Sequence, residues 1–177
     1  RMRRLFRWPE HVSEMARGFV DGAIEEHAEK RRVPLERVLV VGVHVRRGDK
    51  LFELDIFDEW SFGSEYLSRA IQMVQRRHPP TEASLLLIVT TDDPEWVGKY
   101  MHKLPMVLSP FATTPYCKMA LTCADPLVDM AILSMCDAVV VSGSSTFSWW
   151  SAYLSSDEAF AVAPRLPVVD ERCAQPD

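Results

Sequence analysis

"VLVVGVHVRRGDK", residues 38–50, starts as an unbroken apolar and mostly β-branched run and ends in a cluster of charges. A continuous run of this kind is typical of a strand that is covered on both faces of a parallel sheet. A second such run, "SLLLIVTT" at 84–91, also ends in polar residues. The two runs predict neighbouring buried strands whose polar ends carry the chemistry.

Helical and extended patterns alternate along the rest of the chain. Helices are predicted over 11–30, 64–78, 92–103, 125–136 and 146–155, the second with Ser64 as its N-cap. Further strands are predicted over 104–109, over 137–145 before a Gly/Ser turn, and over 159–164. This alternation predicts a doubly wound, Rossmann-like parallel α/β sheet, forming one domain over residues 1–177.

Composition excludes several classes of protein. With 20 Lys and Arg against 25 Asp and Glu, the net charge is −5, so a general nucleic-acid-binding surface is not expected. No apolar run approaches the roughly 18 residues that span a bilayer, and no signal peptide is visible. The chain begins with Arg1, so we expect it to be a piece of a longer protein, with any membrane anchor outside it.

The four cysteines match no metal-binding pattern. Cys136 follows an apolar helical pattern and is predicted to be a buried thiol. Cys117 and Cys123 could form a short disulfide in an oxidising compartment or remain reduced. Cys173 lies apart near the C-terminus.

Three polar clusters follow predicted strands. They are His44, Arg46, Arg47 and Asp49; Thr90, Thr91, Asp92 and Asp93; and Ser142, Gly143, Ser144, Ser145 and Thr146. In sheets of this type ligands bind beyond the carboxyl ends of the strands. We therefore expect the clusters to converge on one rim.

The two adjacent arginines favour an anion site at that rim. An arginine fork suits a diphosphate, and neighbouring residues near a strand end point opposite ways, so one arginine should face the cleft. The alternative interpretation is a salt bridge between Arg47 and Asp49 that only fixes the turn. We expect one arginine to bind the anion and the other to be structural. Arg47-Gly48-Asp49 as an adhesion tripeptide is disfavoured, because it directly follows a buried strand.

"SGSST", residues 142–146, leads from strand to helix and is either a second anion cradle or a plain helix cap. No GxxxxGK[ST] or GxGxxG motif is present. Asp129 could accept hydrogen bonds from a guanine edge or be an ordinary solvent-facing charge. Asp92 and Asp93 could bind sugar or metal, or simply begin a helix.

The aromatic residues divide into two groups. Phe147, Trp149, Trp150 and Tyr153 are predicted to pack in the core, because one short helix cannot point all four the same way. Trp60 and Phe62, in a polar loop, are predicted to be exposed and to contact an acceptor.

With these residues assembled, the chain resembles the α1,2-fucosyltransferase family and, more distantly, the α1,6- and protein-O-fucosyltransferases. "GVHVRRGDK" (42–50) is similar to the first motif of that superfamily, H-x-R-R-x-D. "VTTDDPEW" (89–96) resembles its acidic segment, and "DMAILSMCDAVVVSGSSTFSWWSAYL" (129–154) resembles the helix–strand–helix block of the α1,2 family. "EYLSRAI" (65–71) fits the helix between them.

The resemblance implies the donor-binding half of a metal-independent, inverting, GT-B-type enzyme. Such an enzyme would transfer fucose from GDP-fucose to a galactosyl glycan, with no cofactor besides this donor. It also implies roles for residues in the matching motifs. His44 and Asp129 would contact guanine, Arg46 the diphosphate, and Ser145 and Thr146 the nucleotide, while Asp49, Asp92 and Asp93 would organise the donor pocket. Arg47 and Ser144 are further candidate donor-binding residues.

The sequence offers alternatives for the catalytic base, the type of enzyme and its compartment. The candidate catalytic residues are Arg46, Asp49 and Glu53. Glu53 is the candidate base, although Asp55 and Asp58 are also near the first motif. An α1,6-type enzyme, a protein-O-fucosyltransferase and a non-catalytic GDP-sugar-binding module are the alternatives. An animal-type relative implies the Golgi lumen, and a bacterial relative implies the cytoplasm.

Overall fold

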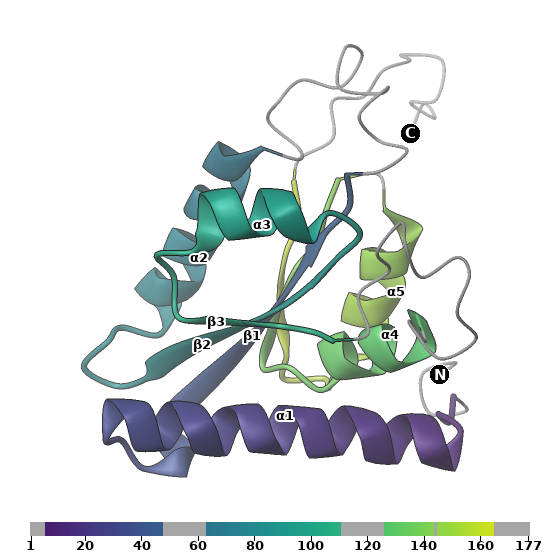
Figure 1. Cartoon of the computed structure of the whole chain (residues 1–177), viewed down its shortest axis with the longest axis horizontal. Helices are drawn as coiled ribbons and strands as arrows, with labels where there is room; N and C mark the ends of the chain where they lie inside the picture. The colour runs from purple at the N-terminus through teal and green to yellow at the C-terminus, as the bar shows by residue number, and fades with distance from the viewer. Residues whose placement is uncertain (1–5, 48–62, 111–125, 144, 165–177) are drawn as a thin grey trace, which may run out of the picture.

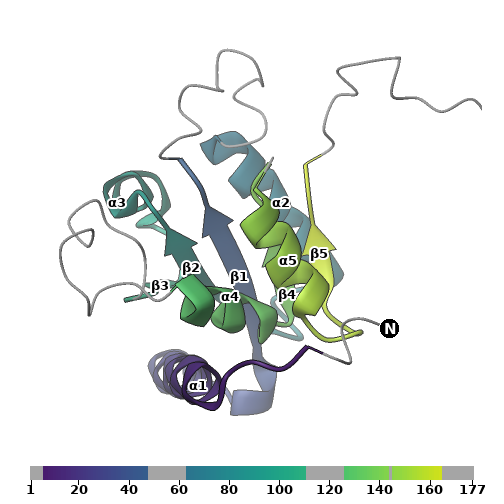
Figure 2. The ribbon, with the colours of Figure 1, turned by 90° about the vertical axis from the view of Figure 1, so that its right-hand side faces the viewer.

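The computed structural model describes residues 6–47, 63–110, 126–143 and 145–164. Within these ranges, five parallel strands form one sheet in the order β3-β2-β1-β4-β5 (Figures 1 and 2). The strands are β1 (Val38–Val45), β2 (Ser84–Thr91), β3 (Met106–Leu108), β4 (Ala138–Val140) and β5 (Phe160–Val162). The helices are α1 (Glu10–Arg31), the short 3₁₀ helix η2 (Leu35–Arg37), α2 (Ser64–Arg77), α3 (Pro94–Met101), α4 (Pro126–Ser134) and α5 (Thr146–Leu154).

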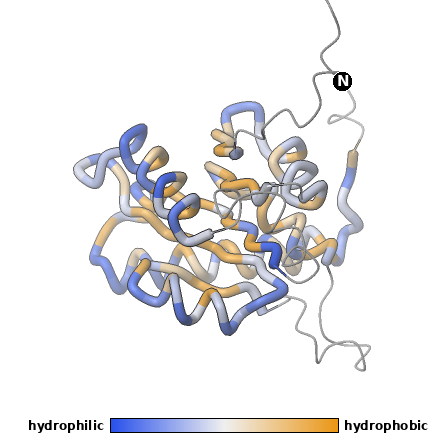
Figure 3. Tube along the Cα trace, turned by 90° about the horizontal axis from the view of Figure 1, so that it is seen from above, coloured by the Kyte–Doolittle hydropathy of each residue, from blue (hydrophilic) through white to orange (hydrophobic). Residues whose placement is uncertain are grey.

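Helices cover both faces of the sheet, which explains the unbroken apolar runs of β1 and β2. On one face, sheet residues Val41, Val43, Val45, Leu87 and Val89 pack with Leu67, Ala70, Ile71 and Val74 of α2 and Val97 and Met101 of α3. On the other face, Val40, Leu86 and Ile88 pack with Val12, Ala16 and Val20 of α1 and Val128, Ala131 and Ile132 of α4. Figure 3 shows hydrophobic segments of the trace running between more hydrophilic ones. The predicted doubly wound α/β fold is therefore confirmed.

The order of elements is as predicted, and the differences lie at their ends. The predicted strands at 104–109, 137–145 and 159–164 pair over only three residues each. Ser64 is the first residue of α2 and Gly63 is its N-cap, so the expected capping role of Ser64 is wrong. The Ser64 backbone carbonyl instead accepts a hydrogen bond from the hydroxyl of Ser68, one turn later.

Cys136 is a buried thiol, as predicted, and burial raises its pKa well above the usual range. The other three cysteines lie outside the described residues. Among the helices that the structure describes, none is long and apolar enough to cross a bilayer.

Gly42 allows α4 to lie close against the centre of the sheet. A Cβ atom at this position would lie 2.9 Å from Leu133 Cδ2 and 3.0 Å from Cys136 Sγ. Leu133 and Cys136 are themselves buried, so neither can move without disturbing its neighbours. The glycine therefore sets the distance between β1 and α4, which carries Asp129.

Gly42→Ala is expected to destabilise the fold by about 1–3 kcal/mol, as overpacking of a filled core does. Gly42→Val should cost more. Denaturant unfolding followed by circular dichroism measures the change. Gly22→Ala is the matched control, because Gly22 lies in the middle of α1 with nothing within 4 Å of an added Cβ. The control should leave stability unchanged or raise it by up to about 1 kcal/mol. Equal stability of Gly42→Ala and the wild type would contradict the close approach.

Candidate functional site

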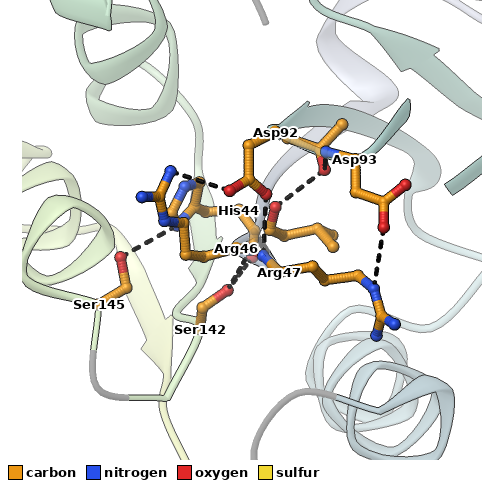
Figure 4. A network of polar contacts seen from close by, with 9 residues as sticks. His44, Arg46, Arg47, Asp92, Asp93, Ser142 and Ser145 are labelled. Carbon is orange, nitrogen blue, oxygen red and sulfur yellow. Dashed lines mark hydrogen bonds and ion pairs between the residues drawn. The ribbon is translucent and has the colours of Figure 1, made fainter. Parts of the chain in front are cut away.

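The carboxyl ends of β1, β2 and β4 meet at one rim of the sheet, as the sequence predicts. Parallel register places His44 beside Thr90 and Val45 beside Thr91. The arginines that follow β1 consequently lie against the aspartates that follow β2. Figure 4 shows these side chains together with serines from the β4–α5 turn.

Asp92 holds the end of β1 through both of its carboxylate oxygens. Oδ1 accepts a 2.8 Å hydrogen bond from the backbone N–H of Arg47, and Oδ2 lies 2.9 Å from Nη1 of Arg46. A carboxylate engaged in this way orients the guanidinium as well as the strand end. Asp92 is thus a positioning group for Arg46.

Arg47 is built into the wall of the site. Its Nε donates to Asp93 Oδ2 at 3.2 Å, and its guanidinium carbon lies 4.5 Å from the centre of the Trp96 ring. Asp93 also caps α3 by accepting the backbone N–H of Trp96 at 3.0 Å. The Arg47 side chain is 16% exposed, whereas that of Arg46 is 38% exposed. Arg47 therefore has the structural role, and Arg46 is the arginine that a ligand can reach.

Two hydroxyl groups form hydrogen bonds to the backbone at the rim, one on either side of Arg46. Ser142, after β4, donates to the backbone carbonyl of His44 and accepts the backbone N–H of Arg46 at 3.3 Å. Thr91 donates to the backbone carbonyl of Val45 at 2.9 Å and accepts the backbone N–H of Asp93. The backbone on both sides of Arg46 is therefore held in place before any ligand arrives.

His44 is a buried, neutral imidazole. Burial, assisted by the nearby positive charge of Arg46, lowers its pKa from 6.5 to about 3. Its Nδ1 lies 3.4 Å from the hydroxyl of Ser145, and its ring lies 4.9 Å from that of Phe147. A neutral imidazole offers one donor and one acceptor nitrogen.

The N-terminus of α5 adds a second positive element. Ser145 occupies the N-cap position, yet its side chain makes no capping hydrogen bond and the first turn carries no acidic residue. The interpretation of "SGSST" as a plain hydroxyl cap is therefore wrong, because the Ser145 hydroxyl lies against His44. Uncapped N–H groups at a helix start attract anions.

Asp129 is buried under the rim, with 5% of its surface exposed. The interpretation of this residue as an ordinary solvent-facing charge is wrong, because α4 turns it toward the sheet. Ser109, which follows β3, donates a 2.5 Å hydrogen bond to Asp129 Oδ1. A buried carboxylate with a fixed partner is typical of a recognition group.

The aromatic residues of α5 correct a further prediction. Trp149 and Trp150 are 47% and 49% exposed, and Tyr153 is also exposed, so these side chains are not in the core. The buried face of α5 is formed by Ser148 and Ser151, whose small side chains let the helix pack closely. Thr146 and the three aromatic residues line an open pocket of about 340 Å³. Phe147 alone of the four predicted core aromatics turns inward, against His44.

The structure thus brings together His44, Arg46, Arg47, Asp92, Asp93 and Ser145 at one rim, with Asp129 beneath it. Thr146, the first residue of α5, is exposed. Asp49, Glu53 and Ser144 lie outside the described residues, as do Asp55, Asp58, Trp60 and Phe62, so the candidate base stays a prediction. In the described ranges no three potential metal-ligating side chains come together.

Sequence reasoning missed Ser109 and Trp96. Ser109 is the last residue of the strand predicted over 104–109 and follows β3 in the structure, and only the register of β3 against β2 places it under the site. Trp96 lies in the acidic segment at 89–96, and its spacing of three residues from Asp93 is the signal for the helix cap.

Solved structures of similar fold include two kinds of fucosyltransferase. NodZ α1,6-fucosyltransferase, co-crystallised with GDP, matches with a TM-score of 0.51 and 20% identity over 80% of this chain and 42% of that chain. POFUT1 in complex with GDP matches with a TM-score of 0.53 and 15% identity over 88% of this chain and 46% of that chain. At these identities the likeness shows the fold alone, and the chain corresponds to less than half of either structure.

Curated relatives are also glycosyltransferases. A galactoside 2-alpha-L-fucosyltransferase of Caenorhabditis elegans is 30% identical over 131 residues, covering 66% of this chain and 30% of the relative. The O-antigen biosynthesis glycosyltransferase WbnK of Escherichia coli is 24% identical over 139 residues, 76% of this chain and 41% of the relative. The chain therefore spans less than half the length of either protein.

A match to a family of glycosyltransferases agrees with the resemblance seen in the motifs. The pattern of glycosyl transferase family 11 matches residues 14–176, nearly the whole chain. The match includes every residue of the rim described above. The chain belongs to glycosyl transferase family 11.

Proposed function

We propose that this chain binds GDP-fucose as the donor-binding domain of a fucosyltransferase that forms α1,2 links on a galactosyl glycan. The observation that carries the proposal is the arrangement around Arg46. Its guanidinium is partly exposed, held by Asp92, and placed on the same rim as the neutral His44 and the start of α5, which the Ser145 side chain does not cap.

Arg46 and the N-terminus of α5 would bind the diphosphate. As the bond from fucose to phosphate breaks, negative charge develops on the departing GDP, and a fixed cation stabilises it. Arg46 meets this need because Asp92 and Ser142 hold its side chain and backbone in advance. Such a site performs the transfer without a metal ion, and an acceptor hydroxyl attacking from the opposite side inverts the anomeric carbon.

His44 and Asp129 would bind the guanine base. Guanine presents the N1–H and N2–H₂ groups on one edge, and a carboxylate accepts both at once. Asp129 is buried on the same side of the sheet as His44, because α4 covers that face. The neutral imidazole then contacts a second part of the base.

The α1,2 linkage is supported by the Caenorhabditis elegans relative, whose name specifies a galactoside 2-alpha-L-fucosyltransferase. The likeness to the α1,6-enzyme NodZ and to POFUT1 favours the alternative of another acceptor linkage. A GDP-sugar-binding module without transfer is the remaining candidate. In the transferase, Glu53 would act as the base on the acceptor hydroxyl and Asp49 would organise the donor pocket. The full enzyme would lie in the Golgi lumen or in a bacterial cytoplasm.

GDP-fucose is expected to raise the melting temperature of the chain, with or without EDTA. At about 100 times its Kd a ligand adds about 2.7 kcal/mol to the folded state. Arg46→Ala should weaken binding about 10- to 100-fold, because it removes charge-assisted hydrogen bonds worth roughly 1.5–3 kcal/mol. Differential scanning fluorimetry with GDP-fucose, GDP and ADP measures both effects.

The matched control for this change is Arg76→Ala, which removes the same charge from the exposed last turn of α2. This control should bind GDP-fucose as the wild type does. Equal shifts with ADP and GDP, or an unchanged affinity in Arg46→Ala, would contradict the proposed donor site.

Binding of GDP-fucose is expected to change little between pH 8 and pH 5.5. A histidine with the ordinary pKa of 6.5 would gain a proton in this range, whereas His44, with a pKa of about 3, stays neutral throughout. Because protonation of His44 begins only well below pH 5, its contact with the base should be lost only there. Isothermal titration calorimetry at pH 8, 6.5 and 5.5 tests this. A steep fall in affinity through pH 6.5 would show that His44 titrates in the site.

The linkage is tested by transfer assays with this chain and with longer polypeptides that contain it. The acceptors are a terminal β-galactoside, an N-acetylglucosamine oligosaccharide and a folded peptide domain. Fucose appearing on the 2-hydroxyl of galactose is the expected result. Transfer only to another acceptor would replace the α1,2 assignment while leaving the donor site intact.

A further inference from the structure

A row of side chains crosses the sheet directly beneath the rim. His44 lies opposite Thr90 in the β1–β2 register. Leu108 lies opposite Val89, and the backbone N–H of Ser109 donates to the carbonyl of Val89, so the ladder continues and brings Ser109 level with Thr90. Ser109, Thr90 and His44 therefore follow one another across β3, β2 and β1.

All three side chains of this row project on the face covered by α4. Val107 and Ile88, two residues earlier on their strands, pack in the core cluster of α1 and α4. Gly42, two residues before His44, faces Leu133 and Cys136. Because side chains alternate along a strand, the row faces the same way, toward the helix that carries Asp129.

Ser109 is hydrogen-bonded to Asp129. The hydroxyl of Ser109, 2% exposed, donates to Asp129 Oδ1 at 2.5 Å. A carboxyl group rotates about its last side-chain bond unless a partner fixes it, and that torsion is broad and weakly restrained by itself. Ser109 thus restrains the plane of the Asp129 carboxylate.

Thr90 lies between Ser109 and His44 in this row, and its side chain is a second indication that a ligand binds here. Among the described residues, its Oγ1 is the buried side-chain polar atom that lacks a hydrogen-bond partner. An unpaired buried hydroxyl costs roughly 1–3 kcal/mol, and native proteins pair nearly all such groups. A row of buried side chains that contains an unpaired hydroxyl is typical of a binding site in which the ligand supplies the missing hydrogen-bond partner.

We propose that Ser109 is a positioning residue for base recognition: its hydrogen bond fixes the Asp129 carboxylate so that both oxygens meet the N1–H and N2–H₂ edge of guanine. The inference deepens the proposed GDP-fucose site and rests on it. Bidentate contact depends on the plane of the carboxylate, whereas a single hydrogen bond tolerates rotation. Loss of Ser109 therefore reduces the discrimination between bases more than it reduces binding of the diphosphate.

The experiment compares GDP with inosine diphosphate, which lacks the 2-amino group, and with ADP, by calorimetry on the full 177-residue chain. The wild type should bind GDP more tightly than inosine diphosphate, and ADP weakest. Ser109→Ala should weaken GDP binding about tenfold and inosine diphosphate binding much less, so that the ratio of the two affinities falls several-fold. Ser109→Thr keeps the hydroxyl and should restore the wild-type ratio.

A double-mutant cycle shows whether Ser109 acts through Asp129. With Asp129→Asn as background, adding Ser109→Ala should change GDP affinity by less than twofold, because the carboxylate it orients is already gone. If Ser109→Ala does not fold, Ser109→Cys replaces it in the comparison and the cycle, since a thiol of similar size is a weaker donor. The control for removal of a buried hydroxyl is Ser134→Ala on α4, whose hydroxyl bonds to the backbone of its own helix.

The outcomes separate this inference from the proposed function. A wild type that prefers GDP, together with a Ser109→Ala variant that loses GDP and inosine diphosphate affinity equally, would overturn the positioning role and leave the donor site standing. A wild type that shows no preference for GDP over ADP would overturn both.

Discussion

The parallel pairing of β1 with β2 determines which side chains meet at the rim. Eight consecutive residues are in register, from Val38 opposite Ser84 to Val45 opposite Thr91. A slip of either strand by one residue would turn its side chains to the other face of the sheet and separate Arg46 from Asp92. The apolar side chains on the two faces of the sheet resist such a shift, because it would bury the wrong residues against α2 and α4. The chemistry of the rim therefore depends on the packing of the core.

Among the described residues, each arginine of the rim is paired with an aspartate before any ligand binds. Arg46 pairs with Asp92 and Arg47 with Asp93, so two cations face two anions. Partly exposed pairs of this kind contribute little to stability, about 0–1 kcal/mol each. Their effect is geometric, since each aspartate also accepts a backbone N–H group and fixes the strand end or the start of α3. A diphosphate entering the site would meet a guanidinium whose orientation is already set.

The sequence alone predicts the fold and the convergence of the strand ends, because β-branched runs and terminal charges are local patterns. It also predicts that the two arginines divide their roles. It does not reveal the inward direction of Asp129, since an acidic residue in an apolar helix fits either side until the neighbouring Ser109 is placed. The sequence also does not reveal that Trp149 and Trp150 face outward. Hydrophobicity alone predicts that these aromatic residues are buried, whereas the buried face of α5 is formed by its serines.

The residues of the site come from distant parts of the chain, and this has a consequence for how the protein folds. Ser142 contacts residues 96 and 98 positions away, and Ser145 reaches His44 across 101 positions. Contacts of such long sequence separation form slowly, because the loop that they close must first lose its freedom. During synthesis, β1 and β2 can pair long before β4 emerges, while the site is still incomplete. Ligand binding would accordingly report that the last strands have docked, and not merely that a sheet has begun to form.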